Sequence, residues 1–576
     1  MKKIGIGYEF YKNMIDENCY FVDKTSLIQD IVQDGGKVTL FTRPRRFGKT
    51  LALTMLQAFF ECEMDRNGNR IDNSHYFEGK KIMDAKDEVI SMMGQYPVIF
   101  LSLKSAKQPN FASAFFQLKS DISFEISRHS YLLKSDKLEK TSADRLKKLY
   151  DSPLSSYLMP QDEARLEADV SDFAHALQIL SICLKQYHGK NTIILLDEYD
   201  VPLENAYYAG FYDQMVGFIR SLFESSLKTN PTLERAVVTG CLRISRESIF
   251  TGLNHLEINT VRDARFVEGF GFTDQETADM LEYYDLSEKM PEVRKWYDGY
   301  LFGQTEIYNP WSVIKYVYKH QVSRDAFPEP YWANTSSNTI IRDLVYHADT
   351  KMREELDTLI AFETIEKKIH EEITYDDVYK NEENLWNFLF FTGYLRKVSE
   401  RTEGRDIYLT MRIPNQEICS IYENQIRGWF EEIVKKTDQS KFYQAVLERD
   451  TESMGRFITS LLNKSISTFD SKESFYHGFL LSILYGTPDY VAKSNREEGD
   501  GRPDIVLYPG WPKAPAILFE IKVRKKYSEM ADGICEAFTQ IRDKKYKEGI
   551  LDDGYNGVIS FGVCFCKKSA IFEEML

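Results

Sequence analysis

One segment near the N-terminus constrains the fold more than any other part of the 576-residue sequence. It runs KVTLFTRPRRFGKTLALTMLQAFF: a short apolar strand pattern, a polar turn, and an apolar helical pattern. Gly48, Lys49 and Thr50 stand where the turn meets the helix. Such a turn presents backbone N–H groups and the positive end of a helix to an anion. The segment therefore predicts a phosphate-binding loop in an α/β protein.

The residue types at this loop suit a nucleotide with Mg²⁺, as in a Walker A motif. Gly48 lets the backbone close around phosphate, Lys49 can reach the β and γ phosphates, and Thr50 can hold the metal. The usual pattern has glycine where this chain has Arg43, so the loop is recognisable but non-standard. The predicted nucleotide-binding residues are Arg43, Pro44, Arg45, Arg46, Phe47, Gly48, Lys49 and Thr50. An ordinary turn between a strand and a helix is the alternative.

A second apolar strand pattern, NTIILLDEYDVPL, ends in two carboxylates, as a Walker B strand does. Asp197 is predicted to assist Mg²⁺ coordination, and Glu198 is predicted as the catalytic residue that orients and polarises the attacking water. The alternative is a strand that ends in a solvated acidic turn. In the following pattern, RAVVTGCLRISRESIF, Thr239 is predicted to sense the γ phosphate, and Arg243 or Arg246 to supply positive charge. Surface arginines are equally consistent with that sequence.

Strand and helix patterns alternate through the first half of the chain. Buried strands are expected at 37–42, 97–103, 192–196 and 236–239, with helices between them, which predicts a parallel sheet covered on both faces. From about residue 273 to 470 the pattern is mostly helical and charged. The last hundred residues return to a compact α/β pattern. We therefore expect an α/β domain with the phosphate loop at 1–272, a helical lid and connecting region at 273–440, and a second, compact α/β domain at 441–576.

A second set of charged residues near the C-terminus has the chemistry of a metal-dependent nuclease. In GRPDIVLYPGWPKAPAILFEIKV, Asp504 precedes one strand pattern, and Glu520 and Lys522 lie two apart on the next, so they share one face. Carboxylates hold Mg²⁺ or Mn²⁺, the metal activates water, and lysine positions the nucleophile. These three residues are the predicted catalytic group, with Asp504 and Glu520 as metal ligands. A charged pair on an exposed strand is the alternative.

Several segments together resemble a known family. FVDKTSLI, TRPRRFGKT, LLDEYD, TGCLRISRESIF and KWYDGYLFG with YNPWSVIKY resemble the AAA-ATPase-like domain of many bacterial proteins. The resemblance covers roughly the first 320 residues and implies an AAA-like fold that binds ATP. In that family the RPRRFGKT form of the loop is the rule. The 148 positions from Lys49 to Asp197 are a longer interval than in well-studied AAA proteins and predict an inserted helical region.

The C-terminal segment resembles the PD-(D/E)XK phosphodiesterase superfamily, whose fold is α/β and restriction-endonuclease-like. That resemblance implies that Glu473, on the pattern SKESFYHGFLLSIL, can join the metal site. It also implies that Gln540 and Tyr546, in AFTQIRDKKY, support the site or contact DNA. His477 follows Glu473 by one helical turn, and we favour a structural role for it over a ligand role.

The charge and the cysteine content of the sequence bear on whether it binds nucleic acid and on whether its thiols are reduced. Lys plus Arg number 73 and Asp plus Glu 88, a net charge of −15 that at first argues against nucleic-acid binding. However, Gly35–Ala58 holds five basic and no acidic residues, and Lys493–Glu548 holds twelve basic and ten acidic ones. Both basic windows coincide with predicted phosphate sites. The eight cysteines form no CxxC pair, and Cys564 and Cys566 are expected on one strand face, so we expect reduced thiols.

The N-terminus lacks the apolar core of a signal peptide, and apolar runs elsewhere are short, so we expect a cytoplasmic protein without a membrane segment. The leading hypothesis is an ATP-binding and ATP-hydrolysing protein coupled to metal-dependent cleavage of DNA. One alternative is a nucleotide-dependent switch that forms a homo-oligomer through the AAA-like domain, or binds a protein partner, with a C-terminal module that only recognises DNA. Another is a scaffold with two degenerate sites.

Overall fold

A computed structural model describes the chain except residues 158–161, 243–248, 251–254, 333–340, 343, 345, 347, 370–377, 379–381, 464–472, 495–501 and 512–513. The chain divides into two compact units. The first comprises Met1–Ser337 and Glu366–Cys419, and the second comprises Asn338–Ile365 and Ser420–Leu576. Within the described residues, no helix combines the length and apolar character that crossing a membrane requires.

A five-stranded parallel sheet forms the centre of the first unit. Its strands are β1 (Val38–Thr42), β2 (Val98–Ser102), β3 (Thr192–Asp197), β4 (Leu233–Gly240) and β5 (Leu256–Asn259). They lie in the order β2-β3-β4-β1-β5, and every pair is parallel. The four strands predicted from apolar runs are confirmed. The partly exposed edge strand β5 was not predicted, because its residues do not form a continuous apolar run.

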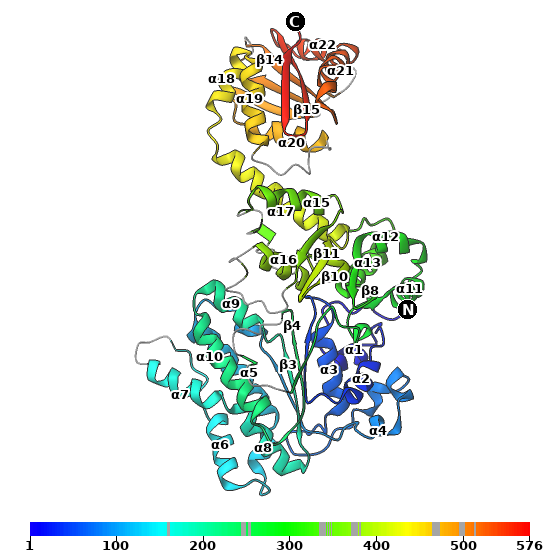
Figure 1. Cartoon of the computed structure of the whole chain (residues 1–576), viewed down its shortest axis with the longest axis vertical. Coiled ribbons are helices and arrows are strands. Elements are labelled where there is room, and N and C mark those ends of the chain that lie inside the picture. The colour runs from blue at the N-terminus through cyan, green and yellow to red at the C-terminus, as the bar shows by residue number, and fades with distance from the viewer. Residues whose placement is uncertain are drawn as a thin grey trace. The chain divides into compact units, whose positions relative to one another are not determined.

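Helices cover both faces of this sheet, with α1, α2 and α3 in one layer and α5, α8 and α10 in the other (Figure 1). The helices up to β4 are α1 (Tyr11–Asp16), α2 (Ser26–Asp34), α3 (Lys49–Phe60), α4 (Asp87–Ile90), α5 (Phe111–Arg128), α6 (Lys140–Tyr150), α7 (Glu163–Phe173), α8 (Ala176–His188), α9 (Val201–Ala209) and α10 (Tyr212–Phe223). Helices α5 to α8 occupy the interval between β2 and β3. The long spacing between the two phosphate-site motifs is thus explained by inserted helices.

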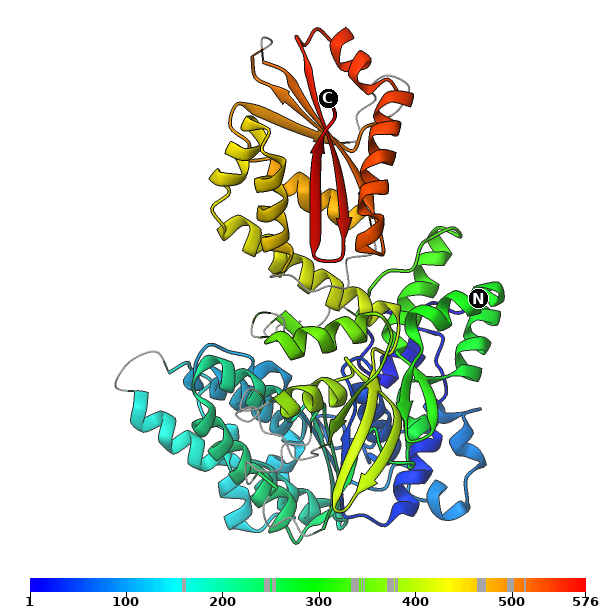
Figure 2. The same cartoon turned by 45° about the horizontal axis from the view of Figure 1, so that its top comes forward.

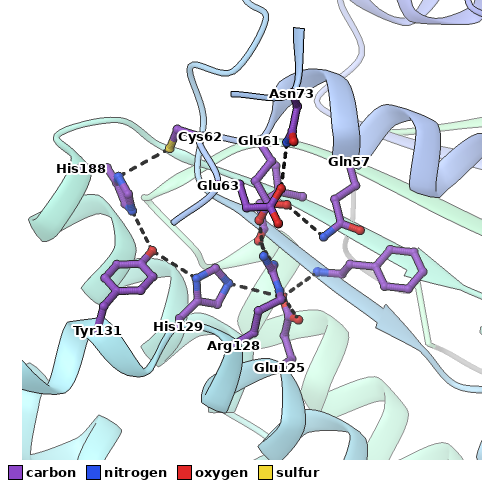
Figure 3. Close-up of polar contacts among 12 residues, drawn as sticks. Gln57, Glu61, Cys62, Glu63, Asn73, Glu125, Arg128, His129, Tyr131 and His188 are labelled. Atoms are coloured by element: carbon purple, nitrogen blue, oxygen red, sulfur yellow. Dashed lines mark hydrogen bonds and ion pairs between the residues drawn. The ribbon is translucent and has the colours of Figure 1, made fainter. Parts of the chain in front are cut away.

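Side chains from α5 close the outer edge of β2. Glu125 accepts a hydrogen bond of 2.9 Å from the backbone N–H of Phe100, and Arg128 donates one of 2.6 Å to the carbonyl oxygen of Val98. A wider network of polar contacts surrounds this pair (Figure 3). Burial raises the pKa of Glu125, but the charge of Arg128 and hydrogen bonds from Arg128 and His129 outweigh it and hold the pKa at about 2. The Phe100 N–H and the Val98 carbonyl oxygen are therefore not free to pair with another strand.

The region that follows the central sheet is helical but also contains two small antiparallel sheets. Its helices are α11 (Asp274–Tyr283), α12 (Met290–Tyr297), α13 (Pro310–Val322) and α16 (Glu382–Phe391). One sheet has the order β6-β8-β7, from β6 (Phe272–Thr273), β7 (Tyr300–Phe302) and β8 (Thr305–Tyr308). The other has the order β10-β11-β9, from β9 (Ile365–Lys368), β10 (Arg396–Glu403) and β11 (Asp406–Arg412). The sequence analysis predicted the helices and missed these strands, since they are short or, like β10, exposed on both faces.

The second unit contains a mixed five-stranded sheet. Its strands are β12 (Tyr490–Ser494), β13 (Ile505–Pro509), β14 (Ala516–Val523), β15 (Val558–Cys566) and β16 (Ser569–Glu574), in chain order across the sheet. Only β14 and β15 run parallel to each other. Cys564 and Cys566 on β15 are buried together in one apolar cluster, as expected for residues on one strand face.

Helices flank this sheet on both sides, with α18 and α19 on one side and α21 on the other (Figure 2). The helices of this part are α15 (Thr350–Ile360), α17 (Gln416–Lys436), α18 (Ser440–Glu448), α19 (Thr451–Leu462), α20 (Glu473–Leu484), α21 (Met530–Asp543) and α22 (Tyr546–Asp552). Helix α17 begins in the first unit, at Gln416, and continues into the second. The chain is thus an α/β protein in which a P-loop-like domain with a parallel sheet precedes a nuclease-like domain with a mixed sheet.

Candidate active sites

The loop between β1 and α3 curls around the side chain of Lys49. Gly48 precedes α3 with a φ of +83°, in the left-handed region that favours glycine. The Lys49 side chain is buried, and its ammonium donates to the carbonyl oxygens of Arg43, at 3.0 Å, and Pro44, at 3.1 Å. A positive charge is therefore held inside a backbone loop at the N-terminus of a helix, an arrangement that suits a phosphate group.

Asp197, the last residue of β3, links three elements around this loop. Its Oδ2 accepts a hydrogen bond of 2.7 Å from Thr50 at the start of α3, and its Oδ1 accepts one of 2.6 Å from Thr239 on β4. Burial and the charge of Glu198 raise the pKa of Asp197, and the two hydroxyl donors oppose that shift. Glu198 follows with a φ of +50°. The sequence-predicted Thr50, Asp197, Glu198 and Thr239 are thus brought together.

The Arg43 side chain, predicted to contact a nucleotide, is fully buried away from solvent. Its guanidinium donates to the backbone carbonyl oxygen of Asn259 at 3.0 Å and to that residue's side-chain oxygen at 2.5 Å. The rings of Phe270 and Phe302 each lie 5.2 Å from it. Arg43 therefore ties β1 to the end of β5, and only its backbone lines the loop. The prediction that Arg43 belongs to a nucleotide site therefore rests on its backbone, because its side chain is engaged with Asn259.

The next two arginines remain at the surface of the loop. Arg45 forms an ion pair with Glu204 on α9. Arg46 is exposed, has a φ of +71°, and stacks its guanidinium 4.5 Å from the ring centre of Trp311 on α13. Both arginines keep a positive charge beside Lys49, and each is oriented by a partner far along the chain.

Phe47 and Pro44 anchor the loop by apolar packing instead. Phe47 is buried, with its ring 4.9 Å from that of Tyr300. Pro44 lies so close to Gly393 that a Cβ on that glycine would come within 2.9 Å of the Pro44 side chain. The side chains of these two predicted residues shape the loop and present no polar group to a ligand.

Asp200 is a buried carboxylate that the sequence analysis did not assign. Its Oδ2 accepts the backbone N–H groups of Cys241, at 2.7 Å, and Leu242, at 3.1 Å. Burial raises its pKa to about 6, although the charge of Lys49 and the Cys241 N–H act in the opposite direction. Asp200 thus holds the backbone directly after β4. Its position as the third acid of the LLDEYD segment was the available signal.

Tyr199 supports the same backbone turn. Its hydroxyl donates a hydrogen bond of 2.6 Å to the carbonyl oxygen of Leu242. Gly240 makes room for the ring, because a Cβ there would come within 2.5 Å of it. The turn that follows Thr239 is therefore fixed from two sides. Arg243 and Arg246, predicted to supply positive charge from this turn, lie outside the described residues.

An apolar cavity of about 80 Å³ borders the phosphate-site loop. It is bounded by the loop at Gly48, by α3, by the N-terminal segment and by the region that begins at β6. Its apolar lining includes Val22, Phe47, Leu51, Met55, Phe272 and Ile314. Because these residues come from segments far apart in the chain, no local pattern could have predicted the cavity.

The second candidate site lies where β13 and β14 pair. The antiparallel register sets Ile505 opposite Phe519, which places Asp504 beside Glu520 within β14. The backbone N–H of Ile521 donates a hydrogen bond of 2.7 Å to Oδ2 of Asp504. The ammonium of Lys522 lies 3.0 Å from Oε1 of Glu520. The sequence-predicted Asp504, Glu520 and Lys522 therefore form one group.

The donor set at this site fits a hard divalent cation. Glu520 is fully buried, and its Oε2 has no hydrogen-bond partner among the described residues. Burial and the charge of Asp504 raise the pKa of Glu520 to about 7, and Lys522 opposes the shift. An unsatisfied buried carboxylate oxygen is costly unless a ligand uses it. Mg²⁺ is commonly held by one or two carboxylates, with water and substrate phosphate completing the shell.

The supporting residues differ in how closely they approach this group. Glu473, the first residue of α20, is exposed. Burial lowers the pKa of Lys522, but the charges of Glu520, Asp504 and Glu473 together raise it. Among the described side chains, no three His, Cys, Asp or Glu residues are close enough to hold a metal ion. Glu473 is thus near the group but is not placed as a third ligand.

Gln540 and Tyr546 contact the segment that carries Asp504. Gln540 donates to the Tyr546 hydroxyl at 3.4 Å, and that hydroxyl donates to the carbonyl oxygen of Arg502 at 3.2 Å. Arg502 stands two residues before Asp504. The two side chains are therefore joined to the backbone beside the carboxylates.

Comparisons with known proteins give one family match for each of the two segments that hold these groups. Residues 5–250 match the family model described as a predicted AAA-ATPase, and residues 471–575 match a model of the PD-(D/E)XK nuclease superfamily. A protein of Azotobacter chroococcum mcd 1, described as an uncharacterized protein in the vnfD 5′ region, is 23% identical over 565 residues, which cover 95% of this chain and 93% of the relative. No solved structure matches.

Proposed function

We propose that this chain binds and hydrolyses ATP in its first unit and cleaves DNA phosphodiester bonds in its C-terminal domain. The observation that carries the proposal is the presence of two assembled groups in one chain. Thr50, Asp197 and Thr239 are hydrogen-bonded beside the Lys49 loop, and Asp504 and Glu520 lie beside Lys522. The family-model matches support nucleotide binding for the first group and a nuclease for the second.

The first site would have separate groups for the phosphates, the Mg²⁺ and the base of ATP. The loop at Gly48 and Lys49 would bind the phosphates, and Thr50 with Asp197 would hold Mg²⁺, because a hydroxyl and a carboxylate are its usual protein ligands. The apolar cavity beside Gly48 would receive the base, since such cavities bind flat, mostly apolar groups. Glu198 would orient the attacking water, and Thr239 would sense the γ phosphate.

The second site would act on the DNA backbone. A bound Mg²⁺ or Mn²⁺ would lower the pKa of water and stabilise charge on the phosphoryl oxygens. Asp504 and Glu520 would hold that ion, and Lys522 would position the nucleophile or help remove its proton. Gln540 and Tyr546 would support the segment before Asp504 or contact DNA, and Glu473 would approach the metal from α20.

Two further parts of the proposal concern the cellular location and the oligomeric state of the protein. All eight cysteines are free, which supports a reducing, cytoplasmic location. A homo-oligomer formed through the AAA-like domain stays a prediction, which the sedimentation velocity of the purified chain with and without ATP would test.

A cleavage assay tests both sites and their coupling. We expect the full-length protein to nick plasmid or single-stranded DNA with Mg²⁺ or Mn²⁺, and ATP to change the rate. Lys522→Ala should abolish cleavage, Lys49→Ala should abolish ATP binding and the ATP effect, and the exposed Lys147→Ala serves as the matched control. If no metal and nucleotide combination supports cleavage, and Lys522→Ala has no consequence, the nuclease assignment is wrong.

A further inference from the structure

A histidine on α20 contacts the backbone of the candidate metal ligand Asp504. The Nε2 atom of His477 lies 2.9 Å from the Asp504 carbonyl oxygen and 2.9 Å from Oγ of Ser494, the last residue of β12. A carbonyl oxygen only accepts hydrogen bonds, so Nε2 must carry the proton that it donates. One imidazole therefore joins α20, β12 and the residue that leads into β13.

Asp504 is held at two points as a result. His477 fixes its backbone carbonyl, while the N–H of Ile521 fixes its carboxylate at 2.7 Å. A carboxylate that must meet a cation within a few tenths of an ångström needs both its backbone and its side chain fixed. The backbone contact comes from outside the β13–β14 pair, and strand pairing alone does not supply it.

We propose that His477 is a positioning residue for the metal site, which acts by holding Asp504 in the orientation that meets the cation. This inference rests on the proposed nuclease function. The same contact fixes α20 relative to Asp504, and Glu473 lies one helical turn earlier on that helix. Loss of the imidazole would therefore loosen Asp504 and the approach of Glu473 together.

Helix α20 has a second anchor that does not involve the site. The Tyr476 hydroxyl donates a hydrogen bond of 2.6 Å to the carbonyl oxygen of Lys567, and its ring stacks on Phe565 with centroids 4.3 Å apart. This contact holds α20 against β15 and the turn after it. Both Tyr476 and His477 thus attach the helix to the rest of the domain, and His477 makes the contact with Asp504. Tyr476→Phe is accordingly a matched control, because it removes a hydrogen bond to a carbonyl oxygen from the adjacent residue.

The first experiment measures cleavage by the full-length protein as Mn²⁺ is titrated. His477→Ala should raise the Mn²⁺ concentration for half-maximal cleavage by about 10–100-fold, the usual effect of losing a group that supports a metal ligand. KM for DNA should change by less than about threefold, since phosphate contacts are untouched. His477→Gln should restore most of the affinity, because its amide N–H can take the place of Nε2–H. Tyr476→Phe should match the wild type.

The second experiment does not need cleavage. Hydrogen exchange of peptides that cover residues 502–523 should be faster in His477→Ala than in wild type, with the largest change at the Ile521 amide, and unchanged in Tyr476→Phe. If His477→Ala leaves the Mn²⁺ titration and the exchange unaltered, or if His477→Gln is as impaired as His477→Ala, the positioning role is refuted. If wild type itself never cleaves, the proposed function fails while the exchange data still decide the role of His477.

Discussion

Thr239 donates a hydrogen bond of 2.6 Å to Oδ1 of Asp197, which joins β4 to the carboxyl end of β3. The other oxygen of the same carboxylate accepts from Thr50 at the start of α3. Asp197 is thus oriented by two hydroxyl groups from different elements, and one of them sits at the start of the helix that follows the phosphate loop. A carboxylate fixed in this way cannot turn without breaking one contact.

Thr239→Val should therefore slow ATP hydrolysis more than it weakens ATP binding. The substitution keeps the side-chain shape but removes one donor, a loss of about 1–1.5 kcal/mol or roughly tenfold in rate. We expect the dissociation constant for ATP to change by less than about threefold, because the loop around Lys49 is intact. Steady-state hydrolysis and calorimetric ATP titration measure the two quantities. Thr539→Val, an exposed position on α21, is the control, and an equal loss of binding and hydrolysis would contradict the prediction.

Substitutions of the loop residues Arg43 and Arg45 should differ in their effect on the free energy of unfolding. Arg43→Met leaves both oxygens of Asn259 without their buried donor and should lower the free energy of unfolding by about 1–3 kcal/mol. Arg45→Met breaks a partly exposed ion pair with Glu204 and should change the free energy of unfolding by less than about 1 kcal/mol. Chemical denaturation monitored on the first unit gives both values. A variant at Arg43 that loses ATP binding at unchanged stability would show that its side chain does reach the nucleotide.

The contacts of Arg43 show which features of the loop could not be predicted from the sequence. Local patterns were sufficient for β1, β3 and the Gly48–Thr50 junction, because apolar runs and helix-start residues are contiguous in the chain. The partner of Arg43 is Asn259, more than two hundred positions away, and nothing adjacent to Arg43 indicates it. Its place in the loop predicted a nucleotide-binding residue, and the loop sequence does not indicate that its side chain is buried against Asn259.

At the second site, too, local patterns predicted some features, whereas contacts between distant residues could not be predicted. The E-x-K spacing predicted that Glu520 and Lys522 share a face, and the β13–β14 register brings Asp504 to them. The contact of His477 with the Asp504 carbonyl depends on how α20 packs over the sheet, which residue spacing does not specify. Strand β10 was missed for a different reason, because its side chains are exposed on both faces and leave no alternation.

Glu417 should make the stability of the first unit depend on pH. Its carboxylate oxygens contact the Ser312 hydroxyl, and Oε1 accepts the backbone N–H of Trp332 at 2.8 Å. Burial raises its pKa from 4.5 to about 8. Between these two values the folded state keeps the proton that the unfolded state has lost, so rising pH favours unfolding. The stabilising contribution is complete below about pH 4.5 and disappears as pH rises through 8.

Glu417→Gln should remove this dependence. Thermal unfolding of the wild type between pH 5 and pH 8 should show a melting temperature that falls relative to that of the variant as pH rises. The exposed Glu548→Gln controls for the general loss of a carboxylate. Parallel curves for wild type and Glu417→Gln over this range would mean that Glu417 does not hold its proton in the folded state.

Glu520 links metal binding to stability in the second unit. It lies 3.0 Å from the nearly buried ammonium of Lys522, so Glu520→Gln leaves a buried positive charge without its closest partner. Breaking one side of a buried pair typically costs about 3–5 kcal/mol, whereas replacing both partners by neutral groups is often tolerated. We therefore expect Glu520→Gln to lower the melting temperature, and the double variant Glu520→Gln with Lys522→Met to recover most of it.

The response to Mn²⁺ separates this effect from metal binding. A ligand that binds only the folded state raises the melting temperature, so wild type should be stabilised as Mn²⁺ is added. Neither variant should respond, since both lack the carboxylate whose second oxygen is unsatisfied in the described structure. Differential scanning fluorimetry with Mn²⁺, and with Ca²⁺ as a non-catalytic comparison, measures the shifts. If the double variant is stabilised by Mn²⁺ as strongly as wild type, the cation binds elsewhere and Glu520 is not its ligand.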